Sequence, residues 1–206
     1  MCWKRIKTGA WGGALALLLA ASPVWAQLSA VDADGERVTL NPKGKTTLVL
    51  VGNDEHEEDL RKAASHVDSV RGRPDFRLYV VVDLQDSLGS FAPELVTNQM
   101  KENMNNAVPE LRKLYALHGN PADPRADMAT FADFDGKLVR ALGWKGETED
   151  YLRAVVFDRN GKVVERWGEL RKQEYPEMAA RVNQALGVTP KAVPAAEAVR
   201  VAQPVE

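Results

Sequence analysis

The segment Thr46–Asp59, TTLVLVGNDEHEED, is the feature that most constrains what this chain can fold into. Its β-branched and aliphatic run, Thr46–Val51, ends at Gly52 and predicts a strand that is buried on both faces. The polar residues that follow, Asn53–Asp59, are expected to begin a helix. Free amides and the positive end of the helix dipole meet at such a junction, so α/β folds often place their active sites there.

The next stretch predicts a parallel pair of strands. Helical spacing of apolar residues runs from Glu55 to Val70, and Arg71–Pro74 should end that helix. The segment Phe76–Asp83, FRLYVVVD, has the composition of a second strand. A strand, a helix and another strand in this order indicate a βαβ unit.

Three further features complete the first two-thirds of the domain. Asp34-Gly35 predicts the turn of a short hairpin within Gln27–Leu40. Helical spacing resumes from Val96 to Tyr115, where Pro109 is expected to give either two helices or one kinked helix. The segment Met128–Phe134 is consistent with a strand.

The last third predicts a β-hairpin and a closing helix. Leu152–Asp158 and Lys162–Trp167 flank the turn Arg159–Gly161, and a helix that contains Met178 and Leu186 follows. Gly187 should end that helix.

The first 26 residues have the layout of a secretory signal peptide. A basic start with Lys4, Arg5 and Lys7 precedes the apolar stretch Gly9–Ala21, which is short for a membrane span. Val24-Trp25-Ala26 resembles a cleavage site, so we expect export to the periplasm and cleavage after Ala26. The expected organisation is a signal peptide (1–26), one domain (27–187) and a disordered tail (188–206).

Charge and cysteine content exclude several classes of function. The chain of 206 residues has 27 Lys+Arg and 29 Asp+Glu, and removal of three basic residues with the signal changes the net charge from −2 to −5. A mildly acidic chain is not expected to bind nucleic acid or an anionic membrane surface, and no stable membrane insertion is expected after cleavage. The only cysteine, Cys2, lies in the predicted signal. We therefore expect no disulfide, no thiol chemistry and no cofactor.

The order of elements resembles the thioredoxin-like fold, an α/β three-layer sandwich with a central mixed sheet and a C-terminal hairpin plus helix. Two segments, ATFADFDGKLVRALGW and YLRAVVFDRNGKVVERWGEL, resemble the peroxiredoxin and thioredoxin segments that contain strands and acidic-Gly turns. Export and the absence of cysteine make the layout most similar to that of YtfJ-type periplasmic thioredoxin-like proteins. The resemblance covers roughly Leu28 to Leu186.

The chain departs from this family at the positions that do the chemistry. Thioredoxins have Cys-x-x-Cys, and peroxiredoxins a peroxidatic cysteine, where this chain has Asn53-Asp54-Glu55-His56. The segment Glu149–Leu152 lacks the proline that faces the cysteines in the family. Arg153 falls near a peroxiredoxin arginine that lowers a cysteine pKa, but here no thiol is present for it to act on.

The acidic turn Asp54–Asp59 and its expected neighbours form the candidate site. Parallel strands end at the same edge of a sheet, so the turn should lie beside Asp83 and Asp86 and near the acidic loop 147–150. The alternative is that these carboxylates only cap helix amides and favour the helix dipole. No catalytic residue or metal ligand is assigned, and the candidate binding residues are Asn53, Asp54, Glu55, His56, Asp83, Asp86, Asp150, Tyr151 and Arg153.

The primary hypothesis is a non-catalytic binding or accessory module whose partner is an unknown periplasmic protein or peptide. The alternative is a divalent-cation-binding protein, or a metal-dependent enzyme, that uses Asp54–Asp59 with His56. A third possibility is an accessory protein tethered by an uncleaved signal.

Overall fold

The computed structural model describes residues 29–40, 43–85, 92–120, 122–146 and 150–188. The predicted signal peptide and nearly all of the predicted tail lie outside the described residues, so these two predictions stay untested. No helix in the described part of the chain is both long enough and apolar enough to cross a membrane.

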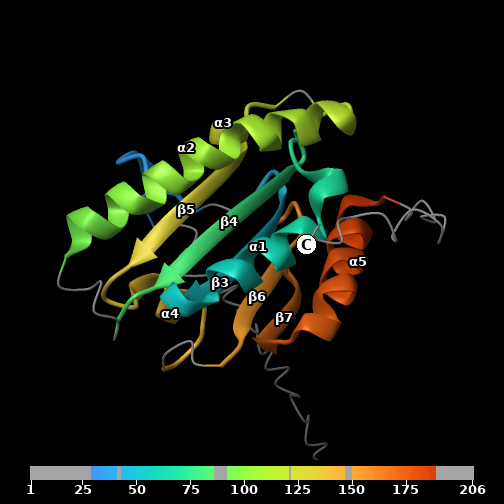
Figure 1. The fold of residues 1–206 in the computed structure, drawn as a ribbon. Helices are drawn as coiled ribbons and strands as arrows, with labels where there is room; N and C mark the ends of the chain where they lie inside the picture. The colour runs from blue at the N-terminus through green and yellow to red at the C-terminus, as the bar shows by residue number, and fades with distance from the viewer. Residues whose placement is uncertain (1–28, 41–42, 86–91, 121, 147–149, 189–206) are drawn as a thin grey trace, which may run out of the picture.

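A five-stranded mixed sheet forms the middle layer of the fold (Figure 1). Its order is β5-β4-β3-β6-β7, with β4 parallel to β3 and β5 parallel to β4, while β6 and β7 are antiparallel to their neighbours. The strands are β3 (Thr46–Asn53), β4 (Phe76–Asp83), β5 (Met128–Asp133), β6 (Leu152–Phe157) and β7 (Val163–Leu170).

Strand β3 is the central strand, and it is buried as its apolar sequence predicts. Residues Thr46–Gly52 are all buried, because β4 and β6 flank the strand and side chains cover both faces. Leu48 and Leu50 point to one core, and Val49 and Val51 point to the other. The period of two along a strand therefore divides one apolar run between two cores.

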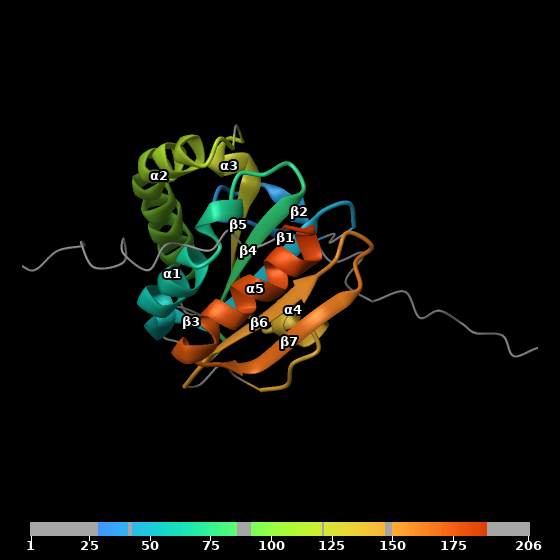
Figure 2. The same cartoon turned by 90° about the vertical axis from the view of Figure 1, so that its right-hand side faces the viewer.

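Helices α1 (Glu57–Ser65) and α5 (Tyr175–Leu186) cover one face of the sheet (Figure 2). The 3₁₀ turns η2 (Asp54–His56), η3 (Asp68–Val70) and η5 (Lys172–Glu174) lie beside these helices in the chain. Apolar residues three and four apart in α1, such as Leu60, Ala63 and Ala64, lie on one side of the helix and pack against the sheet.

The opposite face is covered by helix α4 (Lys137–Ala141) and by the hairpin of β1 (Ser29–Val31) and β2 (Arg37–Thr39). The hairpin contacts the sheet at its β5 edge, where the amide of Ala33 donates to the carbonyl of Thr130 over 2.9 Å. Trp144 packs in this core and Trp167 in the other, so the two faces each bury one tryptophan.

Helix α2 (Pro93–Leu117) lies along edge strand β5, and the short α3 (Pro124–Asp127) leads from it into β5 (Figures 1 and 2). The possibility of two helices is wrong, because Pro109 lies inside one helix of 25 residues. Pro109 and Asn105 are both exposed, so water can satisfy the carbonyl that the proline ring leaves without a donor.

Candidate functional site

The turn after β3 closes on itself through its own side chains. The Asn53 side-chain oxygen accepts from the amide of Glu55 over 3.1 Å, and His56 Nδ1 accepts from the amide of Asn53 over 3.3 Å. Together they form a capping box at the start of η2. Asn53 and His56, which the resemblance in the sequence sets where thioredoxins have cysteines, here accept from backbone amides.

Gly52 allows this turn to pack against β6. A Cβ atom at position 52 would lie 2.9 Å from His56 Cβ and 2.9 Å from a methyl carbon of Leu152. Both distances are shorter than carbon atoms tolerate, so only glycine fits without movement of the turn or of β6. The glycine in the sequence therefore has a packing role at the end of the strand.

Three polar residues form a row across the carboxyl edge of the parallel strands, which we call the carboxyl-edge row: Asn53, Asp83 and Asp133. The strand register places Asn53 opposite Asp83, and Asp83 opposite Asp133. Arg153 on β6 pairs with Val51, two residues before Asn53. The last residue of β3, which directly precedes the acidic turn Asp54–Asp59, therefore lies beside Asp83.

Asp133 is the most distinctive ionisable group of this row. Its side chain is only 3% exposed, and its Oδ2 accepts from the amide of Val139 over 2.9 Å at the start of α4. Burial raises the pKa of Asp133, and the charges of Asp83 and Asp135 act in the same direction, against the hydrogen bond from Val139. The neighbouring Asp83 accepts from the side-chain amide of Gln85 over 2.9 Å.

Asp54 and Glu55 do not join this row. Both are exposed, and within the described residues their carboxylates form no hydrogen bond or ion pair. Asn53, which precedes the acidic turn, therefore lies at the carboxyl-edge row, whereas Asp54 and Glu55 of the turn are exposed. Asp86 lies outside the described residues, as do Glu147 and Glu149.

The segment at the start of β6 brings basic residues toward the turn. Asp150 is exposed, and Tyr151, which is 41% exposed, packs with its ring 5.0 Å from the Arg171 guanidinium. Arg153 donates to the carbonyl of Gly146 over 3.0 Å. The sequence did not indicate Arg171, because its approach depends on β7 returning beside β6.

Asp59, unlike Asp54 and Glu55 of the same turn, has a basic partner among the described residues. Asp59 forms an ion pair of 2.9 Å with Lys172, which joins α1 to η5. Among the described residues, no group of three or more His, Cys, Asp and Glu side chains is arranged to hold a metal ion. The hypothesis of a divalent-cation site at Asp54–Asp59 with His56 therefore stays a prediction without a supporting geometry.

Asp133 was missed as a site residue, although the sequence contained a signal for it. Met128–Phe134 was recognised as a possible strand, but its place in the sheet was not. The rule that selected Asp83, that parallel strands end at one edge, selects Asp133 as soon as β5 is placed beside β4.

Comparison with known proteins gives the fold. No protein-family model matches the chain, and no curated protein sequence matches it. Among solved structures, a candidate thiol:disulfide interchange protein, DsbE, from Chlorobium tepidum has a TM-score of 0.50 at 16% identity, over 78% of this chain and 93% of that chain. A candidate protein disulfide isomerase from Bacteroides thetaiotaomicron has a TM-score of 0.49 at 16% identity, over 78% of this chain and 86% of that chain.

At such low identity the likeness to DsbE shows the fold alone. The chain has a thioredoxin-like fold, with a mixed five-stranded sheet flanked by helices. It has no redox cysteine pair, because its single cysteine is Cys2.

Proposed function

We propose that this protein is an exported, thioredoxin-like binding or accessory module of the periplasm that performs no thiol chemistry. The observation that carries the proposal is the capping box of Asn53 and His56 at the position of the missing cysteines. A helix N-terminus that lowers the pKa of a thiolate in a redox protein here receives an amide oxygen and an imidazole nitrogen. The proposed layout resembles that of YtfJ-type periplasmic thioredoxin-like proteins.

The surface around this turn has the composition of a protein or peptide contact. Tyr151 is exposed and packs against Arg171, and tyrosine and arginine are enriched in protein interfaces. The neighbouring Asp54 and Glu55 are exposed carboxylates that can meet basic groups of a partner. The proposed contact surface therefore consists of Asp54, Glu55, Asp150, Tyr151 and Arg171.

A turnover assay tests the absence of thiol chemistry. The protein purified from periplasmic extract should reduce neither insulin disulfides nor hydrogen peroxide above the rate of a boiled sample. Turnover above that control would refute the proposal. Amino-terminal sequencing of the same material should begin at Gln27, whereas a retained Met1 would support a tethered protein instead.

Site-directed photo-crosslinking tests the proposed contact surface. A photoreactive phenylalanine analogue at Tyr151 should capture a discrete periplasmic partner. The matched control is the same analogue at Leu117, which is 78% exposed at the far end of α2. Equal capture at both positions, or capture at neither, would contradict a contact surface at Tyr151.

Calorimetry distinguishes this proposal from the cation-binding alternative. Titration with calcium, magnesium, zinc and copper should give no heat beyond dilution. A saturable heat that His56→Ala or Asp54→Ala removes would favour the alternative.

A further inference from the structure

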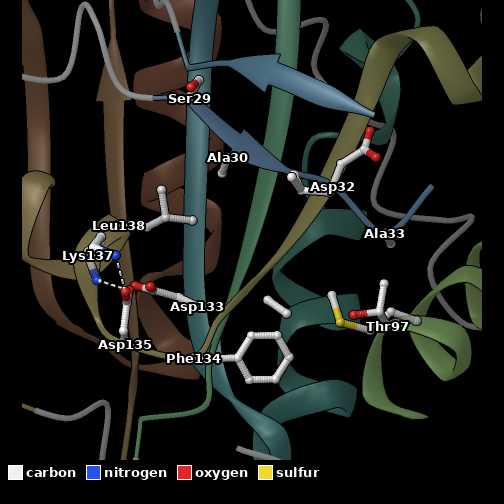
Figure 3. A pocket seen from close by; sticks show the side chains of 13 residues that line it. Ser29, Ala30, Asp32, Ala33, Thr97, Asp133, Phe134, Asp135, Lys137 and Leu138 are labelled. Carbon is white, nitrogen blue, oxygen red and sulfur yellow. Dashed lines mark hydrogen bonds and ion pairs between the residues drawn. The ribbon is translucent and has the colours of Figure 1, made fainter. Parts of the chain in front are cut away.

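A cavity of about 350 Å³ lies beside the carboxyl-edge row, between the hairpin β1–β2, the first turns of α2 and the segment that joins β5 to α4 (Figure 3). Its size is within the range of small-molecule sites, which begins at about 300 Å³. Ala30, Val31, Met100, Phe134 and Leu138 give it an apolar lining. An occupant therefore needs an aliphatic or otherwise apolar body.

The charged groups of the cavity are mostly carboxylates. Asp32, Asp133 and Asp135 line it together with a single basic residue, Lys137. Figure 3 shows Asp133, Asp135 and Lys137 gathered on one wall, with Asp32 and Thr97 on the other side. Lys137 forms an ion pair with Asp135, so the three carboxylates and one cation of the described lining leave a surplus of two negative charges.

Two carboxylates of the lining, those of Asp133 and Asp32, are held in place by backbone amides. Asp133 Oδ2 accepts from Val139 over 2.9 Å, and Asp32 Oδ1 accepts from Asp34 and Glu36 over 2.9 Å each. A backbone bridge between Asp32 and Phe131 fixes the hairpin to β5. Because hydrogen bonds within the chain already orient these two side chains, binding costs little side-chain entropy.

The charge surplus decides which chemical class the cavity favours. Asp133 is 3% exposed, accepts from a backbone amide and forms no ion pair within the described part of the chain. Such a carboxylate gains most from a partner that brings a positive charge and N–H donors. A bare metal ion is a poorer match, because the described residues contain no group of three suitable ligands.

We propose that this cavity binds a monovalent organic cation, an alkylammonium or alkylguanidinium group on a short aliphatic chain. The cationic head would lie between Asp133 and Asp135, and the chain would contact Ala30, Met100 and Phe134. Such a group occurs in free amines and in lysine and arginine side chains. The site is separate from the surface proposed around Tyr151, so either proposal can fail alone.

Nuclear magnetic resonance titration of the exported chain tests this proposal. Added n-butylammonium or n-butylguanidinium should shift the amide signals of residues 30–33 and 132–139 in a saturable way. Neutral n-butanol, which has the same chain and no charge, should bind at least about tenfold more weakly. Absence of saturable shifts with both cations, or equal binding of n-butanol, would overturn the proposal.

Three variants locate the site. Asp133→Asn and Asp135→Asn keep the side-chain shape and should each weaken binding of the cations about tenfold. Asp135 is exposed, so its variant has little effect on folding. Ala30→Leu should fill the cavity and abolish binding of n-butanol as well. The control is Asp123→Asn, the same change at the exposed N-cap of α3, which should bind the cations as the unchanged protein does.

The source of the cation follows from a fourth probe, N-acetyl-lysine methylamide. If it binds at the same signals as n-butylammonium, the cavity accepts a side chain of a peptide. If only n-butylammonium binds, the cavity accepts free amines. Both results support the cation site, whereas unchanged binding of n-butylammonium in Asp133→Asn and Asp135→Asn would refute it.

Discussion

Asp127 directly precedes strand β5 and Asp133 is its last residue, and both are equally buried, each 3% exposed, yet their surroundings differ. Asp127 Oδ2 accepts from the amide of Gly72 over 3.0 Å and from the hydroxyl of Tyr115 over 2.9 Å. Asp133 accepts backbone amides at the start of α4 and has Asp83 and Asp135 as charged neighbours. Burial alone therefore does not tell the role of an aspartate.

The polar residues around Asp127 form what we call the amino-end cluster: Arg71, Gly72, Tyr115 and Asp127. The buried Arg71 pairs with Asp68 over 3.2 Å, and its guanidinium carbon lies 6.0 Å from the centre of the Tyr115 ring. Burial raises the pKa of the Tyr115 hydroxyl, and the charge of Asp127 adds to the effect. This cluster thus gives its carboxylate an amide donor and a hydroxyl donor, and the hydroxyl links α2 to the start of β5.

One buried carboxylate of this chain, Asp127, accepts from an amide and a hydroxyl, whereas another, Asp133, lines a cavity. The amino-end cluster brings donors from two separate segments, at Gly72 and Tyr115, to one carboxylate. In the carboxyl-edge row, Asp83 and Asp133 lie side by side, and Asp133 accepts from the backbone amide of Val139. We expect the first region to contribute to stability and the second to binding, and four measurements test that division.

The largest effect is expected from Gly72→Ala. Gly72 has a φ of +76°, and a Cβ atom there would lie 2.4 Å from a carbon of the Tyr115 ring. Left-handed strain and overpacking together should lower the free energy of unfolding by about 2–5 kcal/mol in urea denaturation. Gly119→Ala is the control, because Gly119 has a φ of +70° with nothing within 4 Å, so only the strain of about 1–2 kcal/mol remains. Equal losses in the two variants would show that Tyr115 does not press on Gly72.

The next effect separates the two aspartates directly. Asp127→Asn removes a charge that accepts from a backbone amide and from a hydroxyl, and it should lower the free energy of unfolding by about 1.5–3 kcal/mol. Asp133→Asn removes a charge that has no cation of its own, so the free energy of unfolding at neutral pH should stay the same or rise. Urea denaturation of both variants measures this difference. A larger loss for Asp133→Asn than for Asp127→Asn would reverse the assigned roles.

A smaller loss is expected from Gly52→Ala in the turn after β3. The added methyl group would meet His56 and Leu152, and the overpacking should lower the free energy of unfolding by about 1–3 kcal/mol. Gly168→Ala in β7 has nothing within 4 Å of the added carbon and should change it by no more than about 0.5 kcal/mol. Similar results for both would mean that the turn can move away from β6 at little cost.

The smallest effect is a pH dependence of opposite sign at two aspartates. Because the pKa of Asp133 is raised in the folded state, the folded protein holds that proton more tightly, and stability is lost as the pH rises through the raised pKa. The stability of Asp133→Asn relative to the unchanged protein should therefore increase from about pH 3 to about pH 7.

Asp75 is the matched case, because its hydrogen bond with Arg73 lowers its pKa. Its contribution to stability is present above the ordinary aspartate pKa and is lost as the pH falls through the lowered one. The relative stability of Asp75→Asn should therefore decrease over the same rise in pH. Slopes of the same sign in the two series would contradict the environment assigned to Asp133.

Local patterns predicted most of the fold, but less of the site. The strand Phe76–Asp83 has the bounds that its sequence indicated, because strong β-formers and turn residues fix both ends. Pro109 shows the limit of such rules. The helix continues through it because Asn105, whose carbonyl receives no donor from the proline, is exposed. Arg171 and Asp133 were missed as site residues, because each approaches the site only through the placement of another strand.

The sequence by itself determined the alternation of strands and helices and the glycine at the end of β3, since both depend on neighbouring residues. Its composition, with Cys2 as the single cysteine, determined the absence of a cysteine pair. Only the tertiary structure decided which buried carboxylate is complete. The donor that Asp127 receives from Gly72 lies 55 residues away, and the neighbour that raises the pKa of Asp133 comes from another strand. Electrostatic energy depends on distance in space and on burial, and a sequence gives neither for residues far apart in the chain.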